Sequence, residues 1–84
     1  MTPTIHRYER VTYRPEGSRA RTVFLEHAKV SGGLLTGIEV DREGVEVWGK
    51  CFDQRRHIIS LELVLLRTPL KMDNEIGELV EEAS

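Results

Sequence analysis

Three histidines and one cysteine are the side chains of this sequence that could bind a transition metal. Imidazole nitrogen and thiolate sulfur are ligands that zinc prefers, and structural zinc sites usually contain ligand pairs about two to five residues apart. The spacing here is much wider, with 21 residues from His6 to His27, 24 from His27 to Cys51 and 30 from His27 to His57. The sequence therefore predicts no metal site and favours ordinary surface or half-buried histidines.

Cys51 and His57 could also act as a nucleophile and its base, because a thiolate needs a base to form. No pattern places the two side chains together, and a free cysteine in a stretch such as 48–52 is usually a small buried hydrophobe. Ser60 lacks the Gly-x-Ser-x-Gly elbow, and Gly32-Gly33 is not followed by the Lys-Ser/Thr of a phosphate loop. We therefore expect no catalytic residue and no cofactor, and interpret the chain as a non-enzyme.

Arginines interleaved with tyrosines near the start of the chain suit a second kind of chemistry. Guanidinium groups bind phosphates and aromatic rings stack on bases, as single-stranded nucleic acid requires. Glu9 and Glu16 dilute this positive charge, and arginines on an edge strand can serve only to prevent aggregation. The candidate nucleic-acid-binding residues are Arg7, Tyr8, Arg10, Tyr13, Arg14, Arg19, Arg21, Arg55 and Arg56.

An apolar surplus in the last third of the chain is the third feature. Residues 63–66 are apolar on both faces of a strand, and such a strand needs a cover on each side. Either a helix carrying the stripe from Met72 to Val80 folds over them, which we favour, or a second chain does. The candidate protein-interaction residues are Leu63, Val64, Leu65, Leu66, Ile76, Leu79 and Val80.

The elements that position these side chains are expected to be strands joined by short turns. β-Branched and aromatic residues predict strands over 5–14 and 21–30. Alternating residues predict a hairpin over 37–48, in which Asp41 accepts backbone hydrogen bonds and Gly44 adopts a positive φ. Alternation also places Leu34, Thr36, Ile38 and Val40 on one face of the hairpin, with Val45 and Val47 opposite them.

The last part of the chain is less regular. Residues 57–66 favour a strand, with a helix as the alternative, and Thr68-Pro69 is expected to interrupt this element. A short helix, capped by Asp73 or Asn74, is expected beyond it. The predicted fold is mainly β, a single small antiparallel barrel or strongly bent sheet of about five strands with a short C-terminal helix.

Length and composition limit the domain organisation. The chain has 84 residues, of which 39% are hydrophobic, and carries a formal net charge of −2. This is enough for one module, with a β-rich domain over 1–71 and an acidic helix or tail over 72–84. The charge is uneven, because residues 1–30 hold six basic and three acidic side chains and residues 72–84 hold five acidic and no basic ones.

Cysteine usage and hydropathy indicate the compartment. A single cysteine forms no internal disulfide, and no apolar segment reads as a signal peptide or a membrane span. We therefore expect a cytoplasmic protein without membrane partners.

The order of elements across 21–66 resembles the small-barrel group that includes Sm-like and SH3-like domains. It consists of a strand, a glycine-containing turn, a strand, an acidic turn, a strand and a final apolar strand. Sm-like proteins shape an RNA pocket with a glycine-bearing element in the last strands, and residues 55–60 here contain no glycine. The resemblance therefore implies a small barrel and transfers no functional residue. The overall sequence, including segment 67–74, also resembles short actinobacterial and phage proteins. This resemblance implies no activity.

These features favour a non-enzymatic module that binds a protein partner or its own copy through strand edges, apolar surplus and oppositely charged ends. The alternative is a nucleic-acid-binding regulator that uses the arginine and tyrosine surface. A further alternative is a structural protein of a phage or another mobile element.

Overall fold

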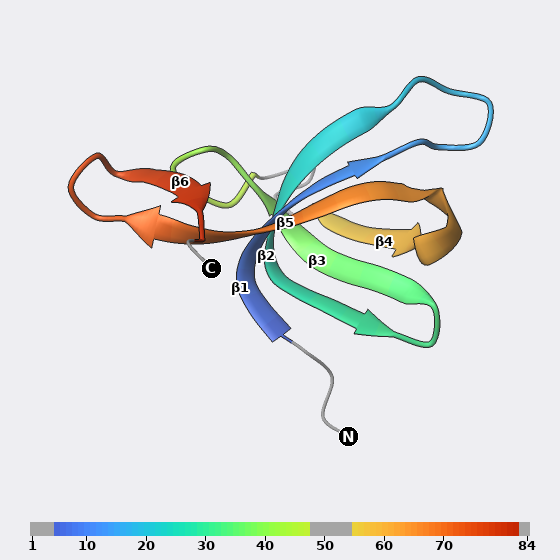
Figure 1. The fold of residues 1–84 in the computed structure, drawn as a ribbon, viewed down its shortest axis with the longest axis horizontal. Coiled ribbons are helices and arrows are strands. Elements are labelled where there is room, and N and C mark those ends of the chain that lie inside the picture. The colour runs from blue at the N-terminus through green and yellow to red at the C-terminus, as the bar shows by residue number, and fades with distance from the viewer. Residues whose placement is uncertain (1–4, 48–54, 83–84) are drawn as a thin grey trace.

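The computed structural model describes residues 5–47 and 55–82, with side chains from Tyr8 onward within those ranges. It forms one six-stranded antiparallel sheet in the order β4-β3-β2-β1-β5-β6 (Figure 1). The strands are β1 (Ile5–Tyr13), β2 (Arg21–Ser31), β3 (Leu34–Val40), β4 (Arg56–Ser60), β5 (Val64–Asp73) and β6 (Glu78–Glu81). The mainly β prediction is confirmed, while the described sheet has one strand more than expected and is not closed into a barrel.

The turn between β2 and β3 is the glycine turn that the sequence predicts. Gly32 and Gly33 have φ values of +59° and +75°, in the left-handed region that favours glycine, and Ser31 pairs directly with Leu34. Further along β2, His27 also has a positive φ of 58°, and the register with β3 shifts between Glu26 and Lys29. This irregularity is a β-bulge, which bends the strand.

The turn after β3 has the chemistry predicted for the hairpin tip. The Asp41 carboxylate accepts hydrogen bonds from the backbone N–H groups of Glu43 (2.8 Å) and Val45 (3.0 Å), and Gly44 has a φ of +77°. In the described part of the chain the returning arm pairs with β3 at the Val40–Glu46 bridge, and the rest of the predicted arm, from residue 48, lies outside the described residues. β3 instead takes β4 as its partner strand, which the sequence did not predict.

The apolar segment after β4 is split. Its first residues form β4, the 3₁₀ helix η2 (Leu61–Leu63) follows, and β5 begins at Val64. The N–H of Leu61 donates to the carbonyl of Gly33 (3.0 Å), and the N–H of Arg14 donates to that of Leu63 (2.9 Å). These two bonds attach η2 to the β2–β3 turn and to the end of β1.

The predicted C-terminal helix is wrong, because β5 and β6 form a hairpin there. Asp73 holds the turn: its carboxylate accepts the Glu75 N–H (2.9 Å) and its carbonyl accepts the Gly77 N–H (2.8 Å). Gly77 has a φ of +71°, a value that a helix does not contain. β6 then pairs with β5 from Leu70–Glu81 to Asp73–Glu78.

Pro69 does not interrupt β5, contrary to the prediction. It pairs with Glu9 of β1, and its carbonyl accepts the Glu82 N–H (3.0 Å). In an antiparallel strand the N and carbonyl of one residue point to the same side. The nitrogen of Pro69 therefore points to the β6 side, where β6 has already ended. Its lack of an N–H group costs no hydrogen bond to β1.

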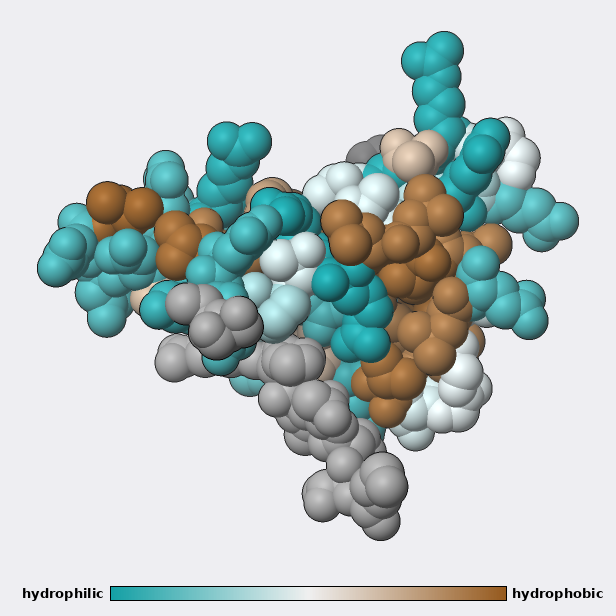
Figure 2. All heavy atoms as spheres, viewed as in Figure 1, coloured by the Kyte–Doolittle hydropathy of each residue, from teal (hydrophilic) through white to brown (hydrophobic). Residues whose placement is uncertain are grey.

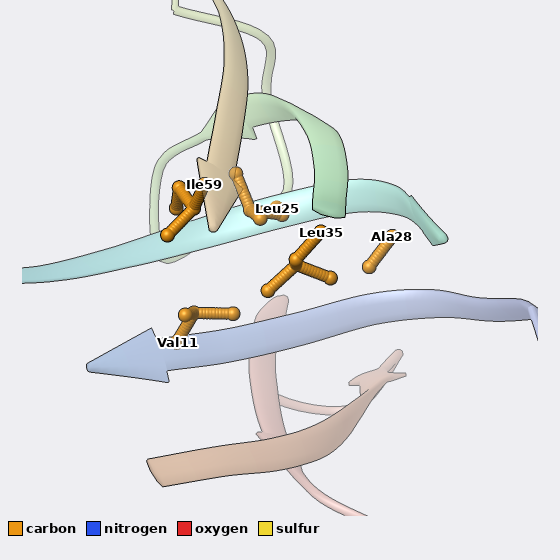
Figure 3. Close-up of a cluster of buried hydrophobic side chains, with 5 residues drawn as sticks. All are labelled: Val11, Leu25, Ala28, Leu35 and Ile59. Atoms are coloured by element: carbon orange, nitrogen blue, oxygen red, sulfur yellow. The ribbon is translucent and has the colours of Figure 1, made fainter. Parts of the chain in front are cut away.

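Hydrophobic side chains form two clusters on opposite faces of the sheet. Adjacent residues of a strand face opposite sides, so Leu25 belongs to one cluster and Phe24 packs against the other. The first cluster consists of the buried residues Val11, Leu25, Ala28, Leu35 and Ile59 from the strands β1 to β4 (Figure 3). The second consists of Tyr8, Val40 and Leu70.

An ion pair between a buried glutamate and an arginine that reaches solvent links β1 to β5. Glu9 is only 1% exposed, and Arg67 binds its carboxylate with both Nε and Nη2, the latter at 2.9 Å. The hydrogen bond to Glu9 raises the pKa of Arg67 above its ordinary value, against the opposing effect of burial. Such a two-point contact satisfies a carboxylate that would be costly to bury alone.

Candidate functional site

A cavity at one end of the sheet brings basic and aromatic side chains together. It lies where β1 and β3 end and where β2 and β4 begin, because antiparallel neighbours place these termini at the same end. Its volume is about 620 Å³. The lining residues are Tyr13, Arg21, Thr22, Val23, Glu39, Arg55, Arg56 and His57.

Glu39 organises one wall of this arginine cavity. Nε2 of His57 donates a hydrogen bond to Oε1 of Glu39 (2.7 Å), and Nη1 of Arg55 lies 3.6 Å from Oε2 of the same carboxylate. Glu39 and His57 are largely covered, whereas Arg55 is exposed. The imidazole is therefore held in a defined orientation, while the Arg55 side chain stays 57% exposed.

The other two arginines of the cavity carry uncompensated charge. Neither Arg21 nor Arg56 has an ion pair with any residue that the structure describes, and both are exposed. Among the lining residues that the structure describes, Glu39 is the single carboxylate, against three arginines. The cavity is consequently an electropositive recess suited to an anion.

The structure separates the predicted nucleic-acid-binding residues. Tyr13, Arg21, Arg55 and Arg56 meet at the arginine cavity. The others do not join them: Tyr8 is buried in the second cluster, Arg10 pairs with Glu81 (2.8 Å), Arg14 donates from Nε to the Ser18 carbonyl (3.3 Å), and Arg19 is exposed. The side chain of Arg7 lies outside the described residues.

Sequence reasoning missed Glu39 as a member of the cavity, whereas His57 directly follows the candidate residues Arg55 and Arg56. Glu39 and His57 are 18 residues apart and meet because β3 pairs with β4, with Gly37 opposite His57. Correct pairing of β3 with the segment at 56–60 would have found them. The sequence indicated a different partner for β3, the 45–48 arm, and so concealed the contact.

The predicted protein-interaction residues also fall into separate groups. Leu63 and Val64 pack against the first cluster and Leu79 against the second, while Val80 is half-buried on β6. Leu65, Leu66 and Ile76 are exposed by 61%, 56% and 59%. Figure 2 shows hydrophobic side chains gathered where β3, β4 and the start of β5 lie. The predicted cover of 63–66 by a C-terminal helix is wrong, because Ile76 lies in the β5–β6 turn.

The outer edge of β4 is unpaired among the described residues. The bonds Glu39 N–H to Arg55 carbonyl and Leu61 N–H to Gly33 carbonyl set the register with β3, so the backbone groups of His57 and Ile59 point toward β3. The N–H and carbonyl groups of Arg56, Ile58 and Ser60 therefore point outward. Ile58 is 65% exposed on this edge.

The β6 edge differs from the β4 edge. The outward-pointing N–H of Leu79 donates to the carbonyl of Arg42 (2.8 Å) in the turn after β3. The turn thus occupies part of this edge, and β4 offers the longer free edge in the described structure.

Comparison with known proteins adds no relative: no family model, no curated protein and no solved structure matches the chain. None of the helices in the described ranges is both long and apolar enough to cross a membrane. Within those ranges no three His, Cys, Asp or Glu side chains are grouped so that they could hold a metal ion. Cys51, the candidate nucleophile, lies outside the described residues.

Proposed function

We propose that the protein is a non-enzymatic interaction module whose partner is a second copy of the same chain, joined through the β4 edge. The observation that carries this proposal is the unpaired edge with outward backbone groups at Arg56, Ile58 and Ser60. A free edge strand is a template for pairing with another strand.

The β4 edge is self-complementary in an antiparallel arrangement. β4 is five residues long with Ile58 at its centre, and a two-fold axis there lets each Ile58 exchange both backbone hydrogen bonds with its copy. Arg56 then lies opposite Ser60 of the copy, so no two arginines oppose each other directly. The pairing also covers the exposed Ile58 side chain, and Leu34, on the same face of β3, lies beside it.

The β4 edge favours a second copy of the chain as its partner. A different protein would have to supply a matching strand, whereas a second copy supplies one with the same length and spacing. Because the contact is narrow, it forms a weak, concentration-dependent dimer rather than an obligate one.

Replacement of Ile58 by proline tests the proposal directly. The Ile58 N–H points away from β3, so Ile58→Pro removes two bonds from the dimer, one donated by each copy, and none from the monomer sheet. Sedimentation equilibrium over a range of protein concentrations is expected to show a dimer for the original chain and a monomer for the variant. Amide exchange at Ile58 is expected to slow as the concentration of the original chain rises.

Ile58→Thr is the matched control, because it keeps the β-branched shape and the N–H group. It is expected to weaken the dimer without abolishing it. A chain that stays monomeric at millimolar concentration, or a dimer that Ile58→Pro leaves intact, would overturn the β4 assignment.

A further inference from the structure

We infer that the arginine cavity binds one nucleotide unit of a single-stranded nucleic acid. The inference goes beyond self-association, because the cavity lies at the end of the sheet and, of its lining residues, Arg56 alone takes part in the proposed β4 edge contact, through its backbone groups. It rests on the cavity volume, on the charge of the lining and on one aromatic ring.

The first step is the phosphate. Three arginines line the recess, and guanidinium binds phosphate oxygens in pairs through its forked N–H groups. Arg21 begins β2, Arg56 begins β4 and Arg55 directly precedes it, so the lining arginines come from strands on both sides of β3. Glu39 opposes an anion, but its oxygens are engaged by His57 and Arg55.

The second step is the base. Tyr13 is half-buried, packs against the first cluster and lines the cavity from the end of β1. A ring anchored in this way is a platform on which a base can stack. The bases of a duplex are already stacked on each other and are not available to Tyr13, so the arrangement favours a single strand.

The third step is size. Cavities of about 300–1,000 Å³ hold small organic ligands, and the arginine cavity has a volume of about 620 Å³. It therefore accommodates one nucleotide, with the neighbouring phosphates of the strand outside it. The exposed Arg19 and Arg14, in the loop between β1 and β2, flank the same end of the sheet.

A second cavity, of about 470 Å³, does not have these properties. Its lining mixes Arg10 and Arg42 with Glu78 and Glu81, and Arg10 is already paired with Glu81. Acidic and basic groups balance there, so the second cavity offers no net attraction for an anion. It supplies a control arginine, Arg42, outside the arginine cavity.

Fluorescence anisotropy with a labelled oligothymidylate at low salt tests the inference. We expect binding that weakens as salt rises, with each arginine that contacts a phosphate contributing about 0.7 to the slope of log affinity against log salt. Arg21→Ala and Arg55→Ala are expected to lower the affinity about fivefold or more and to reduce that slope. Arg42→Ala removes the same charge elsewhere and is expected to change the affinity less than twofold.

Tyr13 separates stacking from charge. Tyr13→Phe is expected to retain binding, while Tyr13→Leu lowers the affinity about tenfold and leaves the salt slope unchanged. The unfolding midpoint of each variant shows whether its sheet is intact. If Tyr13→Leu unfolds the chain, retention by Tyr13→Phe and loss by Arg21→Ala still test the site.

The inference is overturned if the oligothymidylate does not bind at low salt, if Arg42→Ala and Arg21→Ala lose equal affinity, or if a duplex binds as tightly as the single strand. Adenosine monophosphate is the competing source of a phosphate and a base. If it binds as tightly as the oligonucleotide, a free nucleotide is the ligand and the single-strand assignment is wrong. Ile58→Pro is expected to bind the oligonucleotide like the original chain, so failure of the dimer is distinguishable from failure of the site.

Discussion

Gly37 shows how closely β3 approaches β2. A Cβ atom at this position would lie 2.9 Å from Cβ of Leu25, which is fully buried in the first cluster. Real Cβ atoms do not approach one another so closely, so glycine is required by packing and not by backbone conformation.

Gly37→Ala is expected to destabilise the sheet by about 1–3 kcal/mol, because the added methyl forces β3 away from β2. Urea unfolding monitored by circular dichroism measures the change. Ser31→Ala, at an exposed position of β2, serves as the control and is expected to change the unfolding free energy by less than about 0.5 kcal/mol. A Gly37→Ala chain as stable as the original would contradict the close approach.

The Glu9–Arg67 pair combines the cost of burying a carboxylate with the gain of a two-point contact from a guanidinium group. Glu9→Gln leaves Arg67 beside a neutral partner and is expected to lower the free energy of unfolding by about 1–3 kcal/mol, less than for a fully buried pair because Arg67 reaches solvent. Thermal unfolding of the variant, with Glu62→Gln as an exposed control, measures this loss. An equal effect of the two substitutions would show that the pair contributes nothing specific.

At the scale of elements, the C-terminal segment shows how strand pairing can override a helical pattern in the sequence. The apolar residues Met72, Ile76, Leu79 and Val80 have helical spacing, yet the segment forms a hairpin. Local bonds from Asp73 and the positive φ of Gly77 close the turn, and β5 supplies a long partner for β6. Pairing with an existing strand outweighed a weak helical pattern that contains a glycine.

Gly77→Ala discriminates between hairpin and helix by the sign of its effect. In the hairpin, alanine at φ +71° is strained, and a loss of about 1 kcal/mol in the stability of β6 is expected. In a helix the same substitution would stabilise the segment by about as much. Amide exchange at Val80 is the measurement, with faster exchange in the variant expected for the hairpin.

At the scale of the whole molecule, the fold decides which charges meet. The basic and acidic ends of the sequence come together at the Arg10–Glu81 pair, because β1 and β6 both flank β5. Arginines from β2 and β4, more than 30 residues apart, instead converge at the arginine cavity. The small net charge of the chain therefore conceals one compensated region and one electropositive recess.

The sequence by itself determined the local features: a mainly β chain, the strands near 5–14 and 21–30, the glycine turn at 32–33 and the Asp41–Gly44 turn. Each depends on the conformational preferences of a few neighbouring residues, and these preferences act before any tertiary contact forms. Only the tertiary structure decided that β3 pairs with β4, that β6 pairs with β5 and that His57 meets Glu39. These outcomes depend on which distant strands share a register, and alternation along one strand carries no information about its partner.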